Sequence, residues 1–465
     1  MIKNLKLEDI GKSVPKMGLH HLSPTNPTNK ELYGEVNTSF AFINKILDII
    51  PPNIYKDPTL KWLDPGAGTG NFSIILYFKL VEHLKPHFPN IEERKDHILK
   101  NMIYMVEIQP ENVKTLQKLF GPTANIYEGD YLNYLHNSTS NDITPQIFDI
   151  VIGNPPFNCN GLKKVPTNTE YIKKQDGYTI WSAFIITSIG LLKPKTGILC
   201  MFIPSIWLKP DKDRIYYFLT QYDIKKLNCF SNTETNRIFN GNAQTPCCFF
   251  LLTKRETDNI ISIFDTIHSK YIDYHLKQHA PIPVCSVSII NKLQKYSINN
   301  SIKVIKTNMP PKKTFLSSIK SKETPYPNIT TCLLNKGGGV GVSPILVINY
   351  SNNELIGANK SKLILAHKMY GLPYLDLSGE YGISNRDNYI IYKENPEDLI
   401  KLQKFLSTKL AFSVFDSTRY RMRYLEKYAF QLLPDITNLP DFPEEINDET
   451  VADYFRLSKK YFTKK

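Results

Sequence analysis

The sequence predicts an α/β protein, with a doubly wound parallel sheet followed by a second, mixed α/β region. Three observations predict this fold class. Up to residue 255, short apolar runs rich in β-branched residues alternate with helical segments. One of these runs, 60–64, leads into a glycine-rich turn and then a helix. After residue 255 the alternation stops, and basic, proline-containing sequence with short β-like runs follows.

Length and charge divide the chain further. Its 465 residues predict two or three domains, and we expect an arm at 1–30, a first domain at 31–255, a second at 256–433 and a tail at 434–465. The net charge is +13, and residues 250–432 hold 25 Lys and Arg against 14 Asp and Glu. A positive excess concentrated in one segment favours a polyanion partner over an evenly solvated basic surface.

Cysteine usage and hydropathy point to the interior of a cell. The seven cysteines form no CxxC pair and have no regular spacing, so we expect reduced thiols, with no disulfide framework and no metal site. The N-terminus has no apolar signal-peptide core, and no apolar run reaches membrane-spanning length. These features predict an intracellular protein, in a bacterial cytoplasm or at a site of viral replication, with no membrane partner.

The first strand and its turn predict a ligand site. Strand 60–64 ends at Asp64 and runs into Pro65-Gly66-Ala67-Gly68-Thr69-Gly70, and the helical run 71–84 follows. Glycines let a backbone bend sharply and approach a ligand, and a helix N-terminus offers free N–H groups. No Gly-Lys-Ser/Thr follows, so the turn is not a Walker phosphate loop. A nucleotide-type ligand is one interpretation; an ordinary tight turn is the other.

Three more strands end in polar groups. Strand 102–107 ends at Glu107, strand 124–131 carries Gly129-Asp130, and strand 148–152 stops at Asn154-Pro155-Pro156-Phe157. A carboxylate after the second strand of a nucleotide-binding unit usually holds ribose hydroxyls. The carboxyl ends of parallel strands lie along one edge of a sheet, so we expect these groups to meet there.

The remaining elements complete the predicted order. Helices are expected at 40–50, 112–120, 178–192, 211–222 and 396–415, and strands at 196–208, 224–230 and 247–253. The polar segment 86–100 predicts an insertion or surface helix, residues 158–178 a mobile loop over the site, and residues 236–242 a loop tip that carries Phe239.

Two motifs resemble those of a known family. Asp64-Pro65-Gly66-Ala67-Gly68-Thr69-Gly70-Asn71-Phe72 resembles motif I of S-adenosylmethionine-dependent methyltransferases. Asn154-Pro155-Pro156-Phe157 resembles motif IV of amino-methyltransferases. Motif I before motif IV, with a large region afterwards, looks like the gamma-class (Taq-type) DNA N6-adenine methyltransferases of type II restriction–modification systems. The resemblance covers roughly residues 30–255, and segments 362–365, 376–379 and 424–434 look like target-recognition regions.

The resemblance implies a Rossmann-like methyltransferase domain, a DNA target-recognition domain and S-adenosylmethionine as the cofactor. Asp64 and the turn backbone would hold the methionine part, Glu107 the ribose hydroxyls and Asp130 the adenine amino group, with Ile108 and Tyr131 packed on the adenine ring. The implied cofactor residues are Thr38, Asp64, Gly66, Gly68, Gly70, Glu107, Ile108, Asp130 and Tyr131.

The resemblance also implies the chemistry. The Asn154 side-chain oxygen and the Pro155 carbonyl would accept both hydrogens of an adenine amino group, which localises its lone pair. Phe157 would stack on the base, which must be flipped out of a duplex. The implied catalytic residues are Asn154, Pro155, Pro156 and Phe157. The expected substrate contacts are Phe239, Lys163, Lys164, Arg419, Arg421 and Arg423, the last three in a basic run with interleaved aromatics.

Other interpretations stay open at this point. Methyltransferases of RNA amino groups or of protein glutamine also carry Asn-Pro-Pro-Tyr/Phe, and an inactive DNA-binding module with the same fold is a further alternative. We find no Pro-Asp…(Asp/Glu)-x-Lys nuclease site. A monomer acting alone on double-stranded DNA, or together with a separate restriction endonuclease, fits better than a fused nuclease.

Overall fold

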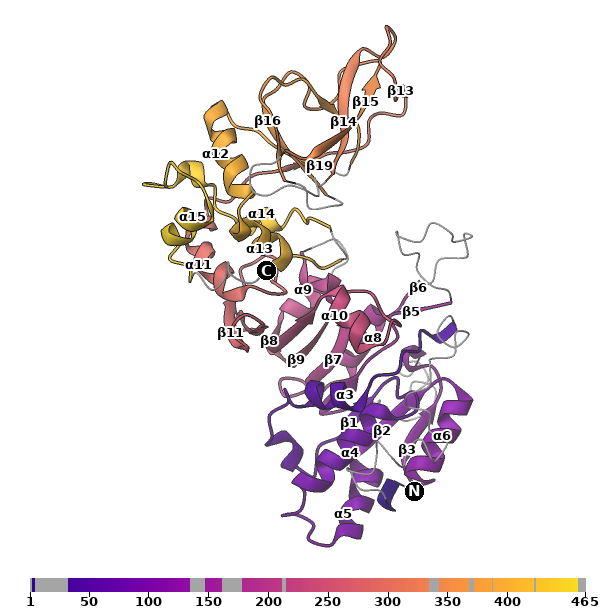
Figure 1. The fold of residues 1–465 in the computed structure, drawn as a ribbon. Coiled ribbons are helices and arrows are strands. Elements are labelled where there is room, and N and C mark those ends of the chain that lie inside the picture. The colour runs from indigo at the N-terminus through magenta and orange to yellow at the C-terminus, as the bar shows by residue number, and fades with distance from the viewer. Residues whose placement is uncertain are drawn as a thin grey trace. The chain divides into compact units, whose positions relative to one another are not determined.

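The computed structural model describes residues 2–4, 32–133, 147–160, 178–210, 215–333, 343–367, 372–386, 388–421 and 424–458. These residues form two compact units (Figure 1). The first comprises residues 1–207 and 211–262, and the second residues 208–210 and 263–465. The domain boundaries expected from the sequence, at residues 30, 255 and 433, stay predictions.

The first unit is built on one mixed sheet, which confirms the predicted α/β fold class. Within this unit the strand order is β8-β9-β7-β4-β1-β2-β3. The strands from β3 to β7 in this order pair in parallel, and β9 pairs antiparallel with β7 and β8. The strands are β1 (Trp62–Asp64), β2 (Ile103–Glu107), β3 (Asn125–Glu128), β4 (Ile150–Gly153), β7 (Ile198–Pro204), β8 (Tyr222–Phe230) and β9 (Cys247–Glu256).

Helices follow β1, β2 and β4, as expected for a doubly wound sheet (Figure 1). Helix α3, which precedes β1, packs on α4, while α6 packs on β2 and β3, and α8 packs on β7. The helices of this unit are α3 (Phe40–Leu47), α4 (Asn71–His83), α5 (Ile91–His97), α6 (Pro110–Phe120), α8 (Trp181–Leu191), α9 (Ile215–Thr220) and α10 (Asn232–Ile238). A short hairpin pairs β5 (Asn158–Cys159) with β6 (Tyr178–Thr179).

One local prediction is wrong. Residues 236–242 were expected to form a loop tip, but 232–238 form α10, and only the turn from Phe239 onward is irregular. The cause is a capping box: the Ser231 side chain accepts from the Glu234 backbone N–H, and the Glu234 carboxylate accepts from the Ser231 N–H. This reciprocal pair satisfies two N–H groups and starts a helix where turn-forming residues are frequent.

The second unit begins within β10 (Ile260–Asp265), which is followed by β11 (Lys270–His275). Its other strands form two four-stranded sheets, in the orders β12-β19-β16-β17 and β13-β15-β14-β18. These strands are β12 (Ile305–Lys306), β13 (Leu316–Ser317), β14 (Tyr326–Leu333), β15 (Ile345–Ser351), β16 (Lys362–Ala366), β17 (Tyr374–Asp376), β18 (Gly382–Ile383) and β19 (Asn388–Ile391).

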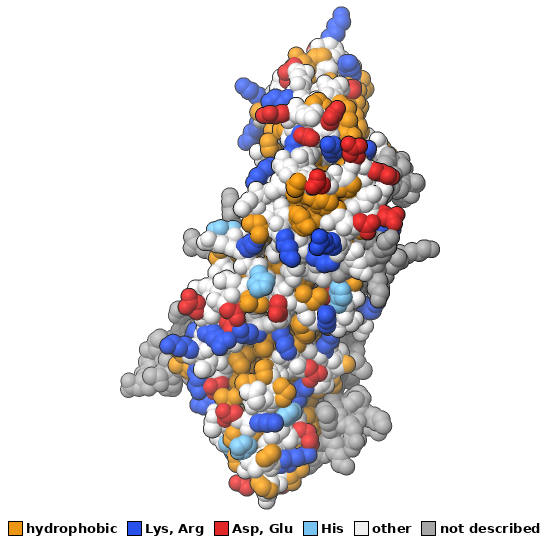
Figure 2. Space-filling view, turned by 90° about the vertical axis from the view of Figure 1, so that its left-hand side faces the viewer, with side chains coloured by type: hydrophobic (Ala, Val, Ile, Leu, Met, Phe, Trp, Pro, Cys, Tyr) orange, Lys and Arg blue, Asp and Glu red, His pale blue; other side chains and the backbone are white. Residues whose placement is uncertain are grey.

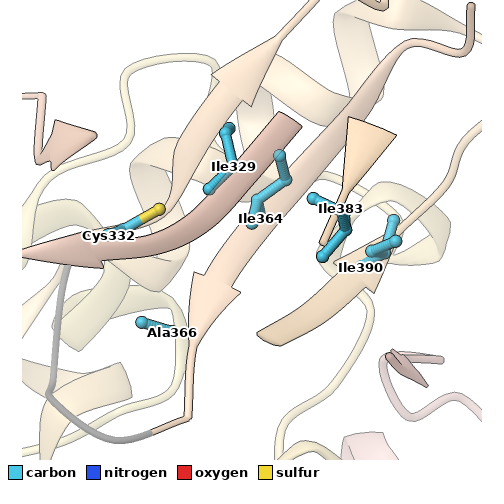
Figure 3. Packing of buried hydrophobic residues seen from close by; sticks show 6 residues of the cluster. All are labelled: Ile329, Cys332, Ile364, Ala366, Ile383 and Ile390. Atoms are coloured by element: carbon cyan, nitrogen blue, oxygen red, sulfur yellow. The ribbon is translucent and has the colours of Figure 1, made fainter. Parts of the chain in front are cut away.

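A shared apolar core joins these two sheets (Figure 3). Ile329 and Cys332 come from β14 and Ile383 from β18, while Ile364 and Ala366 of β16 and Ile390 of β19 face them. All six are at most 1% exposed. The Lys362 ammonium, also buried, pairs with Asp376, whose carboxylate accepts from the backbone N–H groups of Glu380 and Tyr381 at 3.0 Å. This pair fixes the turn after β17.

Helices make up the rest of the second unit. The predicted helix 396–415 is interrupted at Ser407-Thr408, where the Thr408 side chain caps a new helix. The helices are α11 (Val287–Ser297), α12 (Pro396–Leu406), α13 (Lys409–Ser417), α14 (Ala429–Leu432) and α15 (Asp448–Tyr454). Within the parts of the chain that the structure describes, no helix has the length and apolar character needed to cross a membrane.

Candidate active site

A cavity of about 320 Å³ lies in the first unit, where β1, β2, β3 and β4 end. It brings together groups from all four strand ends, as the sequence predicted for one edge of a parallel sheet. Its carboxylates are Glu35, Glu107 and Asp130, and among the described residues that line it there is no Lys, Arg or His. The cavity therefore favours a ligand with positive charge. The predicted site residues that line it are Thr38, Gly66, Gly68, Glu107, Ile108, Asp130, Tyr131, Asn154 and Pro156.

Glu107 ties the end of β2 to the glycine-rich turn. One carboxylate oxygen accepts from the backbone N–H of Gly68 at 2.8 Å, and the other accepts from the backbone N–H of Gln109 at 2.8 Å. The side chain is 5% exposed, and burial raises its pKa above the usual value, although the hydrogen bonds oppose that rise. The Asn112 side-chain nitrogen also donates, at 3.5 Å, to the oxygen that accepts from Gln109. The other oxygen, which accepts from Gly68, keeps a second lone pair and can still accept a ligand hydroxyl group.

Asp64 lies behind the turn and does not line the cavity. It is 2% exposed, and its carboxylate accepts from the Ser73 hydroxyl at 2.9 Å and from the backbone of Gly66. Burial, with a smaller contribution from the charge of Glu107, raises the pKa of Asp64 to about 7. Asp64 thus stabilises the glycine-rich turn through its hydrogen bonds to Gly66 and Ser73. Its direct contact with the methionine part of a cofactor stays a prediction.

The positions of the turn require glycine for different structural reasons. Gly68 has φ +54°, and open space surrounds its Cα on the side where a Cβ would lie. Gly70 has φ +95° at the N-terminus of α4, and a Cβ there would lie 2.9 Å from Leu116 and 3.0 Å from Phe120. Gly70 therefore permits close packing of α4 on α6, while Gly66 and Gly68 face the cavity.

A strap formed by residues 32–38 closes one side of the cavity. Gly34, with φ +68°, approaches the backbone of Asn158 so closely that a Cβ would overlap its carbonyl oxygen. Glu35 accepts from the Gln109 side chain at 3.3 Å. Thr38 is 4% exposed, and its carbonyl accepts from the Asn71 side chain at 2.8 Å. The strap thus contacts Gln109, which follows β2, Asn158 of β5 and Asn71 of α4.

Asn154 follows β4 and lines the cavity. Its side-chain nitrogen donates to the Thr38 hydroxyl at 3.0 Å. Its side-chain oxygen is buried and has no hydrogen-bond partner in the described chain. Buried polar atoms are nearly always paired, and leaving one unpaired costs about 1–3 kcal/mol. The oxygen is therefore an acceptor held ready for a donor that the chain itself does not supply.

The rest of the Asn-Pro-Pro-Phe motif is divided between the cavity and the protein interior. Pro156 lines the cavity, whereas Pro155 and Phe157 do not. The half-buried Phe157 ring stacks on Phe202, with 6.2 Å between centroids and 30° between planes. This contact fixes the ring beside the end of β4.

Three predicted residues surround the mouth of the cavity at the ends of β2 and β3. Ile108 is 47% exposed and lines the cavity, and its packing on an adenine ring stays a prediction. The Asp130 carboxylate accepts from the Leu132 backbone N–H at 2.9 Å. The buried Tyr131 bonds through its hydroxyl to Ser188 at 2.9 Å, so its ring is fixed against the protein.

Of the predicted substrate contacts that the structure describes in the first unit, Phe239 does not line this cavity. Phe239 is 4% exposed and packs edge-on against Phe42 and at a tilt against Phe202, so contact with a base would require its ring to leave this cluster. Arg419 pairs with Asp416 at 2.8 Å, while Arg421 is exposed. Lys163, Lys164 and Arg423 lie outside the described residues. These substrate roles stay predictions.

The sequence did not single out Gln109, Glu35 or Asn71 as site residues. Asn71 lies within the motif I stretch, so its position was a usable signal. Gln109 and Glu35 meet across 74 residues, and nothing in the local pattern indicates that contact.

Comparisons with known proteins agree with the motif pattern. The family described as Eco57I restriction-modification methylase matches residues 76–239, about a third of the chain. No curated protein sequence matches.

Among solved structures, three similar chains come from restriction–modification systems. A chain from a study of complex assembly and conformational transition of the type I R-M system is 17% identical, with a TM-score of 0.39, over 54% of this chain and 48% of that one. A modification subunit of a putative type I restriction enzyme from Vibrio vulnificus YJ016 is 15% identical, with a TM-score of 0.38, over 57% and 54%. The type IIL enzyme MmeI in complex with DNA is 12% identical, with a TM-score of 0.48, over 88% and 70%.

The chain thus spans about half the length of the first two structures. The fold assignment rests on the strand order and not on these low similarities. The first unit is a Rossmann-like domain of the kind found in S-adenosylmethionine-dependent methyltransferases, and residues 76–239 match the restriction-modification methylase family.

Proposed function

We propose that this chain is a site-specific DNA methyltransferase of the gamma (Taq-type) class, which transfers a methyl group from S-adenosylmethionine to the N6 amino group of adenine. The observation that carries the proposal is the unpaired, buried side-chain oxygen of Asn154 at the cavity. The family match over residues 76–239 supports DNA as the substrate class.

The cavity fits S-adenosylmethionine on the chemistry of its lining. The cofactor carries a sulfonium and an ammonium group, and Glu35, Glu107 and Asp130 supply negative charge without a competing cation in the described lining. Glu107 can accept a ribose hydroxyl, and Ile108 offers an exposed apolar surface for the adenine ring. When bound, the cofactor supplies an electrophilic methyl group.

The chain's own residues prepare the acceptor. The exocyclic nitrogen of adenine is a weak nucleophile because its lone pair is delocalised into the ring. The Asn154 oxygen would accept one amino hydrogen, and the Pro155 carbonyl the other, which draws the nitrogen toward tetrahedral geometry. Thr38 holds the Asn154 nitrogen, so the oxygen is oriented before the substrate arrives. The nitrogen needs no strong base before attack, because its proton leaves after methylation.

Adenine must leave the duplex to reach such a cavity, at a cost of a few kcal/mol. Phe157, fixed on Phe202, would provide a ring beside the flipped base. The basic second unit would contribute phosphate contacts. Methylation by such an enzyme would protect DNA from cleavage by a separate restriction endonuclease, which would be its functional partner.

Sequencing DNA from cells that express the protein tests this proposal. We expect N6-methyladenine at one short sequence motif, and none in cells that express the Asn154→Ala variant. If methyl groups were found only in RNA or on protein glutamine, the substrate would be RNA or protein, and the proposal of a DNA substrate would be wrong.

A further inference from the structure

Residues 303–322 of the second unit, here called the lysine margin, carry an unbalanced positive charge. The segment contains Lys303, Lys306, Lys312, Lys313, Lys320 and Lys322 and no Asp or Glu. All six lysines are exposed. None of them forms an ion pair with a carboxylate of the described residues. An exposed cationic segment without internal counterions favours an external polyanion.

The margin follows the borders of both small sheets. β12 is an edge strand of the first sheet and β13 an edge strand of the second. Between them, Thr307 is buried and donates through its hydroxyl to the carbonyl oxygen of Asn388, which fastens the segment to β19. Lys306 therefore lies on the edge strand of one sheet, and the other five lysines lie in the segments that flank β12 and β13.

The backbone of the margin is ordered by its own hydrogen bonds. The Ser317 hydroxyl donates to the Ile319 carbonyl at 2.8 Å and accepts from the Ile319 N–H at 3.0 Å. The Phe315 N–H donates to the Asn352 side chain at 3.1 Å. Binding through these residues would consequently cost side-chain entropy but little backbone ordering.

Apolar side chains lie exposed among the lysines. Phe315 is 58% exposed, Ile319 73% and Met309 57%, and none of them belongs to the core between the sheets. Figure 2 shows hydrophobic side chains interspersed with Lys and Arg at the surface. Lysines on edge strands also discourage edge-to-edge aggregation, but that purpose does not explain exposed phenylalanine and isoleucine beside them.

We propose that the lysine margin is a contact surface for duplex DNA, with the ammonium groups on the phosphates and Phe315 and Ile319 against the sugars. The inference deepens the proposed function and depends on it for the choice of DNA as the polyanion. The margin would contribute to DNA affinity and not to the choice of target sequence, because phosphate contacts carry no base-specific information.

Equilibrium binding of the full chain to an unmethylated, PCR-amplified duplex, measured as a function of salt, tests the charge component. The variant is K312Q/K313Q/K320Q/K322Q. The matched control, K56Q/K85Q/K114Q/K118Q, removes four exposed lysines from the first unit, of which Lys85 and Lys114 pair with glutamates. The logarithm of the binding constant falls linearly with the logarithm of the salt concentration, and each phosphate contact contributes about 0.9 to the magnitude of this slope. We therefore expect the slope of the margin variant to be smaller than that of the wild type by up to about 3.6, and the slope of the control to change little.

A second variant, Phe315→Ala with Ile319→Ala, separates the apolar contacts from charge. We expect weaker binding at every salt concentration with an unchanged slope. Both variants should bind S-adenosylmethionine as the wild type does, which verifies the first unit independently.

A margin variant whose salt slope falls no more than that of the control would overturn the inference, even if the wild type methylates DNA. Conversely, the margin variant could show the expected loss of salt dependence while the wild type methylates no DNA base. That result would contradict the proposed function and leave the margin supported as a DNA surface. Binding only to an acidic protein, and not to DNA, would overturn the margin as a DNA surface.

Discussion

The side-chain nitrogen of Asn154 donates a 3.0 Å hydrogen bond to the hydroxyl of Thr38, which lies 116 residues earlier in the chain. Thr38 in turn accepts, through its carbonyl, from Asn71 at the start of α4. One buried threonine therefore connects the turn expected to hold the cofactor with the amide expected to hold the substrate. The bond also determines which end of the Asn154 amide stays free.

Replacing Thr38 with valine tests this connection. Valine keeps the shape and the backbone carbonyl but removes the acceptor for Asn154, so the amide loses its orientation. A lost hydrogen bond of about 1–2 kcal/mol predicts a roughly 5- to 30-fold fall in kcat. The KM for S-adenosylmethionine should change little, and Thr38→Ser should restore activity. Equal losses in valine and serine variants would indicate a packing effect instead.

Glu107→Gln is expected to weaken cofactor binding. Both oxygens of Glu107 accept from backbone N–H groups, and an amide would set an NH₂ group against one of those donors. We expect a roughly 10- to 100-fold higher Kd for S-adenosylmethionine by calorimetry, equivalent to about 1.4–2.7 kcal/mol. Glu111→Gln, on the exposed side of α6, is the control and should bind normally. Normal binding by Glu107→Gln would remove this residue from the site.

Gly34→Ala should detach the strap from Asn158. An alanine Cβ would overlap the Asn158 carbonyl oxygen, and φ at this residue is +68°. Gly241→Ala is the control, because Gly241 has φ +87° with open space around it, so an alanine there meets no neighbour and suffers conformational strain of about 1–2 kcal/mol alone. We expect Gly34→Ala to lower both thermal stability and cofactor affinity more than the control does. A similar effect of the two substitutions would show that the close approach is unimportant.

The pKa of Asp64, raised to about 7 by burial, predicts a pH dependence of cofactor affinity. A raised carboxyl pKa means that folding favours the protonated form, so its contribution to stability is present at low pH and is lost as pH rises toward about 7. A cationic ligand favours the ionised carboxylate, and its affinity should therefore rise with pH over the same window. S-adenosylhomocysteine, which lacks the sulfonium charge, should show a weaker rise.

Calorimetry of both ligands between about pH 5.5 and about pH 8 measures this difference. Asp64→Asn removes one of the two buried carboxyls whose pKa is raised, the other being Glu107, and should reduce the pH dependence of S-adenosylmethionine affinity. An identical pH dependence for the two ligands would contradict the electrostatic explanation.

Most of the first unit's fold, apart from α10, could be predicted from the sequence because the signals for it are local. Apolar β-branched runs such as 148–152 predict buried parallel strands, and Gly68 and Gly70 mark the turn by the positive φ they adopt. The predicted positions of Glu107, Asp130 and Asn154 at strand ends followed from the rule that parallel strands end along one edge.

Other features depend on contacts that no local pattern contains. The two sheets of the second unit share a core made by residues from Ile329 to Ile390, and their short strands leave only a weak periodic signal. The burial of Phe239 results from packing against Phe42, almost 200 residues earlier. Likewise, the free oxygen of Asn154 follows from Thr38, and not from the Asn-Pro-Pro-Phe motif itself.

The most direct test of the account is the identity of the methylated base. Wild-type protein and the Asn154→Ala variant are incubated with unmethylated DNA and S-adenosylmethionine labelled in the methyl group, and the DNA is digested to nucleosides for mass spectrometry. We expect label only in N6-methyl-2′-deoxyadenosine for the wild type. The variant should fall at least about 100-fold in rate while its affinity for the cofactor persists. Label on another base, or normal turnover by the variant, would contradict the role assigned to Asn154.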